Sequence, residues 1–261
     1  MPASDSLGLD RSEGIAILTI NRPERLNAID RGLLRELDAA FQSLEADSAV
    51  RGVLVTGAGE RAFAAGADLT ELAEASPAEA EQISREGQEL FARIERFPGP
   101  VVAAVRGYAL GGGCELALAC HLRVAADDAR FGLPEVGLGL LPGFGGTVRL
   151  SRLVGLGRAL ELILTGEPVD GRRAAEIGLA NRAVPSGEVL EEGRRLLSRI
   201  LENGPLAVRR AIESVLHAQD VATSEGLRLE RTLFTLLSGS EDMREGVSAF
   251  QEKRPPEFEG R

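Results

Sequence analysis

Residues 101–120 read VVAAVRGYALGGGCELALAC, and this stretch carries the strongest indication of the fold. It begins with Val101–Val105, a continuous apolar run of the kind found in parallel strands that are covered on both faces. The glycines Gly111–Gly113 follow and lead into a helical segment near Cys114. A buried strand followed by a glycine-rich turn and a helix is typical of α/β proteins, so we expect a parallel sheet with helices packed on it.

Before this stretch, strand and helix patterns alternate. Two β-branched runs that end at turn residues predict strands, and two segments with apolar residues at helical spacing predict helices. In chain order these segments are Ile15–Ile20, Leu33–Leu44, Val53–Thr56 and 78–96. Asp68 followed by Glu71 has the spacing of a capping box and predicts a further helix through Ala75.

After this stretch the pattern becomes helical. Leu122–Ala125 predicts one more strand, and helical patterns begin at Val148 and Arg172. Helical segments without any strand pattern then follow at 190–201, 206–217, 224–237 and 242–250. The sequence therefore predicts an α/β core over residues 1–189, which would hold the functional site, and an all-helical C-terminal region over residues 190–261.

Composition narrows the classes of function. The 261 residues include 30 Lys and Arg against 40 Asp and Glu, a net charge of -10, which disfavours nucleic acid as a partner. Lys253 is the sole lysine, which excludes a phosphate loop that ends in Gly-Lys-Ser or Gly-Lys-Thr. Cys114 and Cys120 lack metal-site spacing, and the N-terminal residues resemble no signal or transit segment. We expect a cytoplasmic protein without metal and without a membrane partner.

Two glutamates, Glu115 and Glu135, lie in apolar, glycine-rich stretches without a neighbouring Lys or Arg. Burial of an unpaired carboxylate costs several kcal/mol or raises its pKa. Carboxylates with raised pKa are common general acids and bases, so we interpret the pair as candidate catalytic residues. By itself, Glu115 also fits a residue favoured by the positive end of a helix dipole, and Glu135 fits a solvated loop residue.

Two glycine-rich turns accompany this pair, Phe63–Asp68 and Leu110–Gly113, and each leads into a helix. Small residues at a helix start leave backbone N–H groups free and allow a ligand to approach. If the two turns converge, their amides form an oxyanion hole that stabilises a developing negative oxygen. The segment Gly57–Ala62 fits a dinucleotide fingerprint but runs into a second turn, so we do not expect nicotinamide binding. We interpret Cys114 as a packing residue and His121 as structural.

Three ordered motifs resemble the crotonase (enoyl-CoA hydratase/isomerase) superfamily: FAAGADL at 63–69, AVRGYALGGGCELALAC at 104–120 and ARFGLPEVGLGLLPGFGGTVRL at 129–150. NRPERLNAI at 21–29 and REGVSAFQEKRPPEF at 244–258 extend the resemblance over nearly the whole chain. The resemblance implies an α/β, crotonase-like spiral of repeated ββα units with a C-terminal all-helical subdomain. It also implies acyl-CoA thioester substrates and chemistry that stabilises a thioester enolate.

The resemblance assigns roles to the candidate catalytic residues. Ala67 and Gly112 would supply the two oxyanion N–H groups, Glu115 would activate water, and Glu135 would deliver a proton to the α-carbon. Retention of both glutamates favours an enoyl-CoA hydratase over a Δ3,Δ2-enoyl-CoA isomerase. A non-enzymatic or RNA-binding relative is the third interpretation, which the acidic balance disfavours. Acyl chain length and pathway stay open.

The resemblance also implies how coenzyme A and other subunits would bind. Positions assigned to substrate and CoA binding are Arg25, Ala28, Ala65, Gly66, Asp68, Leu69, Gly143, Phe250 and Lys253. Phe250 and Lys253 match positions that often reach a CoA bound by a neighbouring subunit, and Asp68 fits a helix cap better than a catalyst. The resemblance implies a homotrimer or homohexamer (a dimer of trimers), and no cofactor other than the CoA that the substrate carries.

Overall fold

The computed structural model of the protein describes residues 6–66 and 73–261, and it contains two sheets in this part of the chain. The larger sheet has the strand order β1-β2-β3-β5-β7-β10, and the smaller has the order β4-β6-β8-β9. The strands are β1 Leu7–Ser12, β2 Ile15–Ile20, β3 Gly52–Gly57, β4 Ala62–Ala65, β5 Val101–Val105, β6 Tyr108–Leu110, β7 Leu122–Ala126, β8 Arg130–Gly132, β9 Val169–Asp170 and β10 Arg182–Val184.

The larger sheet is parallel from β2 to β10, and only β1 pairs antiparallel, as a hairpin with β2. Strand β5 lies in its centre between β3 and β7, and every residue of Val101–Val105 is buried. Burial on both faces explains why this strand is a continuous apolar run and not an alternating one. The predicted strands at β2, β3, β5 and β7 are confirmed.

The smaller sheet repeats the path of the larger one. Strands β3, β5 and β7 are each followed within a few residues by β4, β6 and β8, which pair in parallel. A helix then returns the chain, so successive ββα units stack into the expected spiral. The segment Phe63–Ala65 was interpreted as part of a turn, but it belongs to strand β4, so that interpretation was wrong. The strand forms by pairing with β6, which is more than forty positions away in sequence and leaves no local pattern.

Most helices lie within a few residues of the predicted segments or start points, whereas the helix at Leu156–Thr165 was not predicted separately. The helices are α1 Arg31–Glu45, α3 Pro77–Glu95, α4 Gly112–Ala119, α5 Gly146–Val154, α6 Leu156–Thr165, α7 Gly171–Glu176, α8 Val189–Leu201, α9 Pro205–Ala218, α10 Thr223–Leu237 and α11 Glu241–Glu252. Within residues 6–66 and 73–261 the 3₁₀ helices are η1 Pro23–Arg25, η2 Pro134–Leu138 and η3 Ser186–Glu188. Helix α3 starts at a capping box formed by Ser76 and Glu79. The predicted capping box of Asp68 and Glu71 lies outside the described residues.

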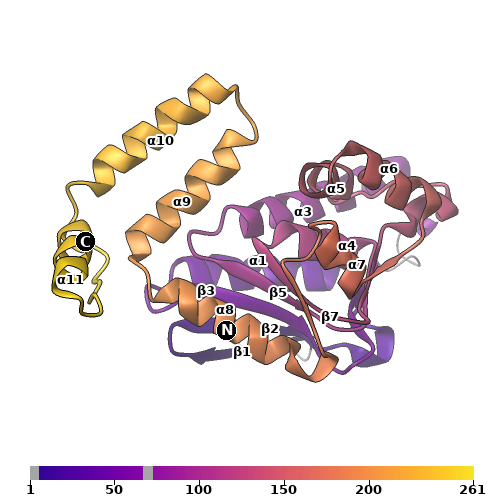
Figure 1. Cartoon of the computed structure of the whole chain (residues 1–261). Helices are drawn as coiled ribbons and strands as arrows, with labels where there is room; N and C mark the ends of the chain where they lie inside the picture. The colour runs from indigo at the N-terminus through magenta and orange to yellow at the C-terminus, as the bar shows by residue number, and fades with distance from the viewer. Residues whose placement is uncertain (1–5, 67–72) are drawn as a thin grey trace.

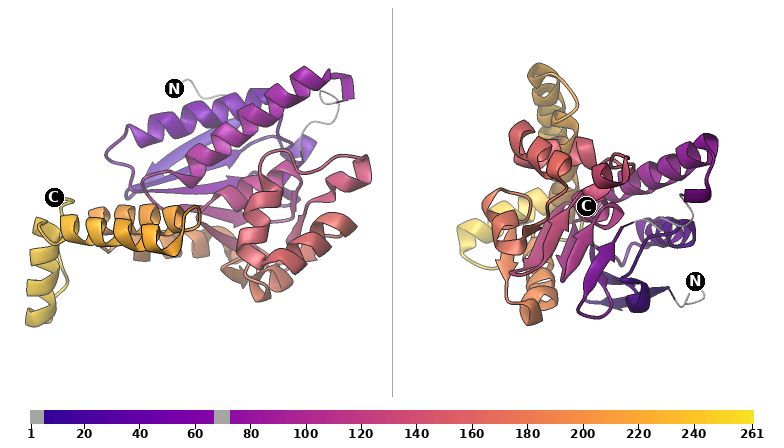
Figure 2. Two further views of the ribbon diagram at one scale, coloured as in Figure 1. Left: turned by 90° about the horizontal axis from the view of Figure 1, so that it is seen from above. Right: turned by 90° about the vertical axis from the view of Figure 1, so that its right-hand side faces the viewer.

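The C-terminal helices divide into one that packs on the sheet and three that extend from it. Helix α8 lies against β3, β5 and β7, whereas α9, α10 and α11 form an arm that projects from the α/β core (Figures 1 and 2). Helices α9 and α10 pack against each other. The division of the chain at residue 190 stays a prediction. In the described residues, none of the helices has the length and apolar character needed to cross a membrane.

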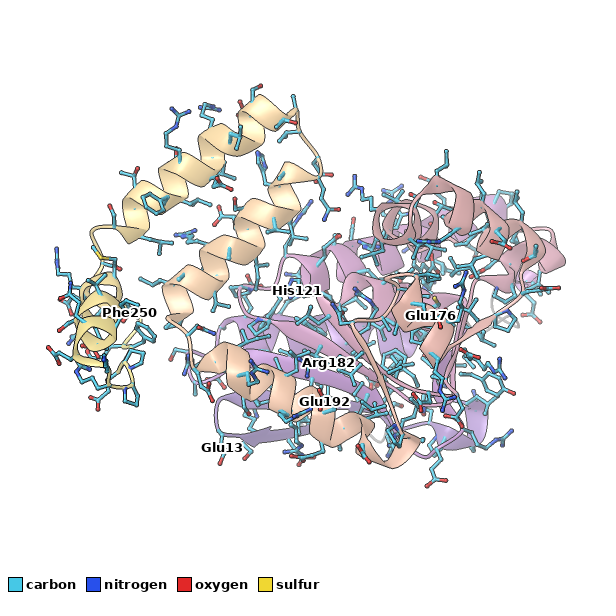
Figure 3. The ribbon with its side chains drawn as sticks, viewed as in Figure 1. Glu13, His121, Glu176, Arg182, Glu192 and Phe250 are labelled. Atoms are coloured by element: carbon cyan, nitrogen blue, oxygen red, sulfur yellow. The ribbon has the colours of Figure 1, made fainter. Side chains whose placement is uncertain are left out.

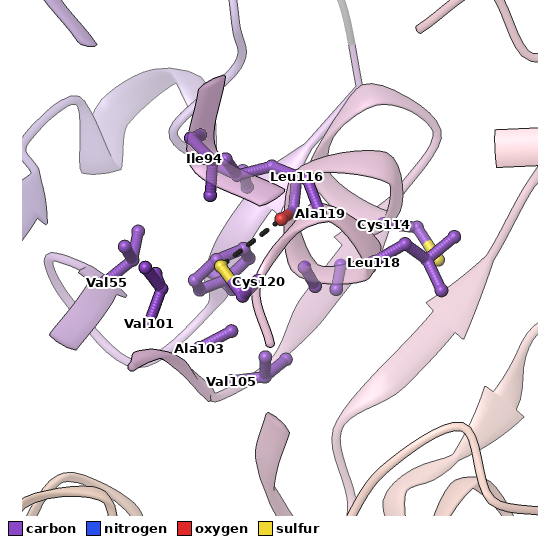
Figure 4. Packing of buried hydrophobic residues seen from close by; sticks show 14 of the residues in the cluster. Val55, Ile94, Val101, Ala103, Val105, Cys114, Leu116, Leu118, Ala119 and Cys120 are labelled. Atoms are coloured by element: carbon purple, nitrogen blue, oxygen red, sulfur yellow. Dashed lines mark hydrogen bonds between the residues drawn. The ribbon is translucent and has the colours of Figure 1, made fainter. Parts of the chain in front are cut away.

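The core joins the two sheets through α4. Cys114 and Cys120 are buried on and just after this helix and belong to the apolar core, as do the labelled side chains of β3, β5 and α3 (Figure 4). Burial raises the pKa of the Cys114 thiol, which is the property of an inert packing residue. His121 joins two segments: its Nδ1 accepts from the Val101 amide and its Nε2 bonds the Glu95 carbonyl at 2.8 Å. These contacts confirm packing and structural roles for Cys114 and His121.

Candidate active site

A cavity of about 390 Å³ opens beside the C-terminal ends of β4 and β6. Both glutamates of the candidate pair, Glu115 and Glu135, line it. The other lining residues that the sequence singled out are Ala65, Gly66, Gly111, Gly112 and Gly143. The fold therefore brings together residues from three separate ββα units around one cavity.

The two glycine-rich segments converge at this cavity, as expected. The Gly66 amide donates to the Leu110 carbonyl at 2.7 Å, which fixes the end of β4 beside the end of β6. At Gly113 a Cβ atom would overlap the carbonyl oxygen of Ala64, so only glycine allows α4 to begin this close to β4. Ala67, the first predicted oxyanion donor, lies outside the described residues, as do Asp68 and Leu69.

The second predicted donor, Gly112, is the first residue of α4. Helical geometry leaves the N–H groups of the first turn without an acceptor inside the helix, and Gly112 lines the cavity. The preceding Gly111 has φ of 50°, which glycine adopts with little strain. A Cβ at Gly111 would lie 2.9 Å from Oε1 of Glu135, so this glycine also makes room for the carboxyl group.

Glu115 is buried in the first turn of α4, with 2% of its surface exposed. Its Oε1 accepts hydrogen bonds from the amides of Phe144 and Gly146, both at 2.8 Å. Burial is the main reason that its pKa rises to about 7, and the Glu135 charge adds to the rise. The two amides and Arg149 oppose the rise. Glu115 can therefore exchange a proton near neutral pH, as a general base must.

Glu135 lies in η2, directly after Pro134. Its Oε2 is buried and has no hydrogen-bond partner among residues 6–66 and 73–261. Partial burial raises its pKa, and a hydrogen bond from its own backbone opposes that rise. An unpaired polar atom in a cavity wall is costly, which marks Glu135 as available to a ligand or a reacting water.

Replacing Glu115 with glutamine is expected to stabilise the protein at alkaline pH. The pKa of Glu115 is about 7 in the folded protein against an ordinary value of 4.5, so its stabilising contribution is complete below pH 4.5 and is lost as pH rises through 7. The difference between these two pKa values corresponds to a loss of about 3 kcal/mol of unfolding free energy by pH 8. Glutamine keeps an oxygen acceptor and does not ionise. Urea unfolding of both proteins at pH 5 and pH 8 measures this difference, and an equal difference at both pH values would contradict it.

The predicted CoA-binding residues fall into two groups. Ala65, Gly66 and Gly143 line the cavity, whereas Arg25 and Ala28 lie beside it, in and just after η1. The Ala65 amide donates to the Leu26 carbonyl at 3.0 Å, which places this segment next to the end of β4.

Phe250 and Lys253 are not at the cavity of this chain. Both belong to the end of the C-terminal arm, where Phe250 is 85% exposed on α11 (Figure 3). Lys253 follows as the C-cap of that helix, with φ of 57°. A CoA contact through these residues would therefore have to come from another copy of the chain.

Sequence reasoning missed the residues that hold Glu115 in place. The amides of Phe144 and Gly146 belong to a loop that carries no chemically reactive side chain, so residue type gave no signal. Ser84 and Arg149 support the same loop through bonds to its carbonyl groups. The available signal was the pair Gly145-Gly146 close before a helix, which is the pattern of a segment that offers backbone N–H groups.

Known proteins match this chain over nearly its whole length. The enoyl-CoA hydratase/isomerase family model matches residues 10–261. The short-chain-enoyl-CoA hydratase of Clostridium acetobutylicum is 42% identical over 246 residues, 94% of each chain. The 2,3-dehydroadipyl-CoA hydratase of Escherichia coli is 44% identical over 253 residues, 97% of this chain and 98% of the relative. A crystal structure of an enoyl-CoA hydratase from Bacillus anthracis has a TM-score of 0.95 and 38% identity, and the match covers 98% of this chain and 100% of that one. The chain therefore belongs to the enoyl-CoA hydratase/isomerase family.

Proposed function

We propose that this protein is an enoyl-CoA hydratase, a hydro-lyase that adds water reversibly across the double bond of a trans-2-enoyl-CoA. One observation carries the proposal: two carboxyl groups with raised pKa line the same cavity, and Glu115 is held by the backbone amides of another segment, whereas Oε2 of Glu135 has no partner in the described residues. An isomerase needs a single proton-transferring group, whereas hydration needs both a base for water and an acid for carbon.

The amide of Gly112 would polarise the thioester carbonyl, together with the amide of Ala67. The positive end of α4 favours negative charge at this place, because the helix dipole adds to the unpaired N–H groups of its first turn. A polarised carbonyl makes the β-carbon electrophilic and stabilises the enolate that forms after attack.

Glu115 would act as the base that activates water. Its two hydrogen bonds of 2.8 Å both go to Oε1, which orients the carboxylate, and Oε2 would contact the water. With a pKa of about 7, a large fraction is ionised at neutral pH, and the group still accepts a proton readily. The hydroxyl would then add to the β-carbon.

Glu135 would deliver a proton to the α-carbon and would receive it back in dehydration. Its raised pKa increases the protonated fraction, and its unpaired Oε2 is available to hold the water between the two glutamates. Apolar side chains of Ile83, Leu138 and Leu141 line the same cavity and would contact the acyl group.

The names of the relatives support this reaction, because those from Clostridium acetobutylicum and Escherichia coli are hydratases of CoA thioesters. The CoA would lie along Arg25–Ala28 and Ala64–Leu69, and no other cofactor is proposed. We further propose a cytoplasmic homotrimer or a dimer of trimers, in which Phe250 and Lys253 of one copy reach the CoA of its neighbour. Sedimentation velocity tests that assembly.

Incubation of the purified protein with crotonyl-CoA in oxygen-18 water tests the reaction. We expect 3-hydroxybutyryl-CoA that carries one labelled oxygen, detected by mass spectrometry. A 3-enoyl-CoA is the discriminating second substrate: its conversion to the 2-enoyl isomer, without labelled product from crotonyl-CoA, would contradict hydration and support isomerisation.

A further inference from the structure

The loop Gly143–Gly146 holds Glu115 and is itself held by α3. The carbonyl oxygen of Gly143 accepts a hydrogen bond from Ser84 Oγ at 2.6 Å and another from Gln88 Nε2 at 2.9 Å. Ser84 and Gln88 are one helical turn apart on α3, so both side chains reach the same carbonyl.

The hydrogen bonds on the two sides of the Gly143–Phe144 peptide group are connected. The Gly143 carbonyl and the Phe144 N–H belong to one peptide, and that N–H donates to Glu115 Oε1 at 2.8 Å. Hydrogen bonds to a carbonyl oxygen polarise the peptide, and a polarised peptide is a stronger donor at its N–H. The path from Ser84 to Glu115 therefore contains two hydrogen bonds and one peptide group, without any direct contact.

We propose that Ser84, assisted by Gln88, is a positioning residue that orients and polarises the Gly143–Phe144 peptide and so controls proton uptake by Glu115. This inference rests on the proposed hydratase function only in giving Glu115 the role of base. The hydrogen-bond path itself is independent of the reaction.

Other contacts prevent the loop from adjusting when one bond changes. A Cβ at Gly87 of α3 would overlap the ring of Phe144, so the ring lies directly on the helix backbone. Phe144 also meets Phe91 edge to face, with ring centroids 5.6 Å apart. Its carbonyl accepts from Arg149 Nη1 at 2.9 Å. These contacts and the Ser84 bond together hold the orientation of the peptide, so loss of the Ser84 bond alone acts mainly through polarisation.

Charged groups around Glu115 set the background for this effect. Glu135 of η2 raises the Glu115 pKa and Arg149 of α5 lowers it, while Glu95 of α3 pairs with that arginine at 3.0 Å. The Cys114 thiol, next to it on α4, has a raised pKa and stays neutral. Strand β4 carries no ionisable side chain, and the only one of β6, that of Tyr108, is 43% exposed. None of these groups changes when Ser84 is replaced.

The test is the pH profile of crotonyl-CoA hydration by Ser84→Ala, Gln88→Ala and the double variant. A weaker Phe144 donor disfavours ionised Glu115, so we expect the acid limb of kcat to move to higher pH by about half a unit in Ser84→Ala and further in the double variant. With a Glu115 pKa of about 7, a movement of half a unit lowers the ionised fraction at pH 7 about twofold, so we expect a loss of kcat of about twofold in Ser84→Ala and a larger loss in the double variant, with KM unchanged. Ser84→Thr keeps a hydroxyl group, so we expect its acid limb of kcat to lie at the same pH as in the unsubstituted protein.

Arg85→Ala is the matched control, because Arg85 is exposed on the same helix and pairs only with Glu81 among the described residues. Its profile should match that of the unsubstituted protein. A loss of kcat in Ser84→Ala without any movement of the limb, or without rescue by Ser84→Thr, would overturn the inference.

A carbon-13 NMR titration of the Glu115 carboxyl, assigned through Glu115→Gln, separates this inference from the proposed function. We expect a higher Glu115 pKa in Ser84→Ala without any substrate present. If the protein failed to hydrate crotonyl-CoA but this shift occurred, the proposed function would be wrong and the inferred role of Ser84 would stand. An unchanged Glu115 pKa would overturn the inferred role of Ser84.

Discussion

Replacing Glu135 with glutamine is expected to lower kcat for crotonyl-CoA hydration about a thousandfold. General acid–base catalysis by one positioned group contributes about 10²- to 10⁴-fold, and glutamine cannot deliver a proton to the α-carbon. The substitution keeps the size of the side chain and removes a carboxyl group whose Oε2 has no partner in the described residues, so folding should be retained. Substrate binding should also be retained, because the oxyanion amides are unchanged.

Steady-state kinetics and calorimetric binding of a saturated acyl-CoA measure the two effects separately. Glu89→Gln is the control, since Glu89 is exposed on α3 and lies outside the cavity lining. We expect its kcat to equal that of the unsubstituted protein. A Glu135→Gln variant with kcat within twofold of normal would remove Glu135 from the reaction.

Replacing Gly113 with alanine is expected to damage both stability and catalysis. The added Cβ would overlap the backbone carbonyl of Ala64, so α4 has to move away from β4. Overpacking against backbone costs about 3 kcal/mol of unfolding free energy. The movement displaces the Gly112 amide and Glu115 together, and a displacement near 1 Å lowers the rate about a hundredfold.

Chemical unfolding and kcat of the Gly113→Ala variant measure these losses. Gly157→Ala is the matched control, because Gly157 is helical in α6 and a Cβ there meets no atom within 4 Å. Alanine at that helical position should stabilise the protein by about 0.5 to 1 kcal/mol and leave kcat unchanged. Equal stability of the two variants would show that close packing of α4 on β4 is not required.

The long apolar strands and the helices were predictable because their patterns are local. Val101–Val105 is apolar at every position because both faces are covered, and Leu33–Leu44 repeats at helical spacing because one side of α1 is buried. Strands β4, β6 and β8 are three or four residues long, and three of the four residues of β4 are alanine. Their existence depends on pairing between distant segments, which a single sequence does not display.

The parts of the candidate site that depend on the type of side chain were predictable from the sequence, and the parts that depend on backbone groups were not. Glu115 and Glu135 stood out because a carboxylate is costly in an apolar, glycine-rich setting. The amides of Phe144 and Gly146 did not, because every residue except proline has an amide and only the path of the loop directs these two to Glu115. Ser84 is remote in sequence, and nothing local connects it with Gly143.

The most direct test of the central claim is the ultraviolet absorbance of the enoyl thioester when the protein is mixed with crotonyl-CoA, run beside Glu115→Gln. The account predicts rapid loss of absorbance with the unsubstituted protein and a loss at least about a hundredfold slower with Glu115→Gln, although the variant is folded and more stable at pH 8. Equal rates for the two proteins would contradict it, and so would the absence of any loss with protein that binds crotonyl-CoA.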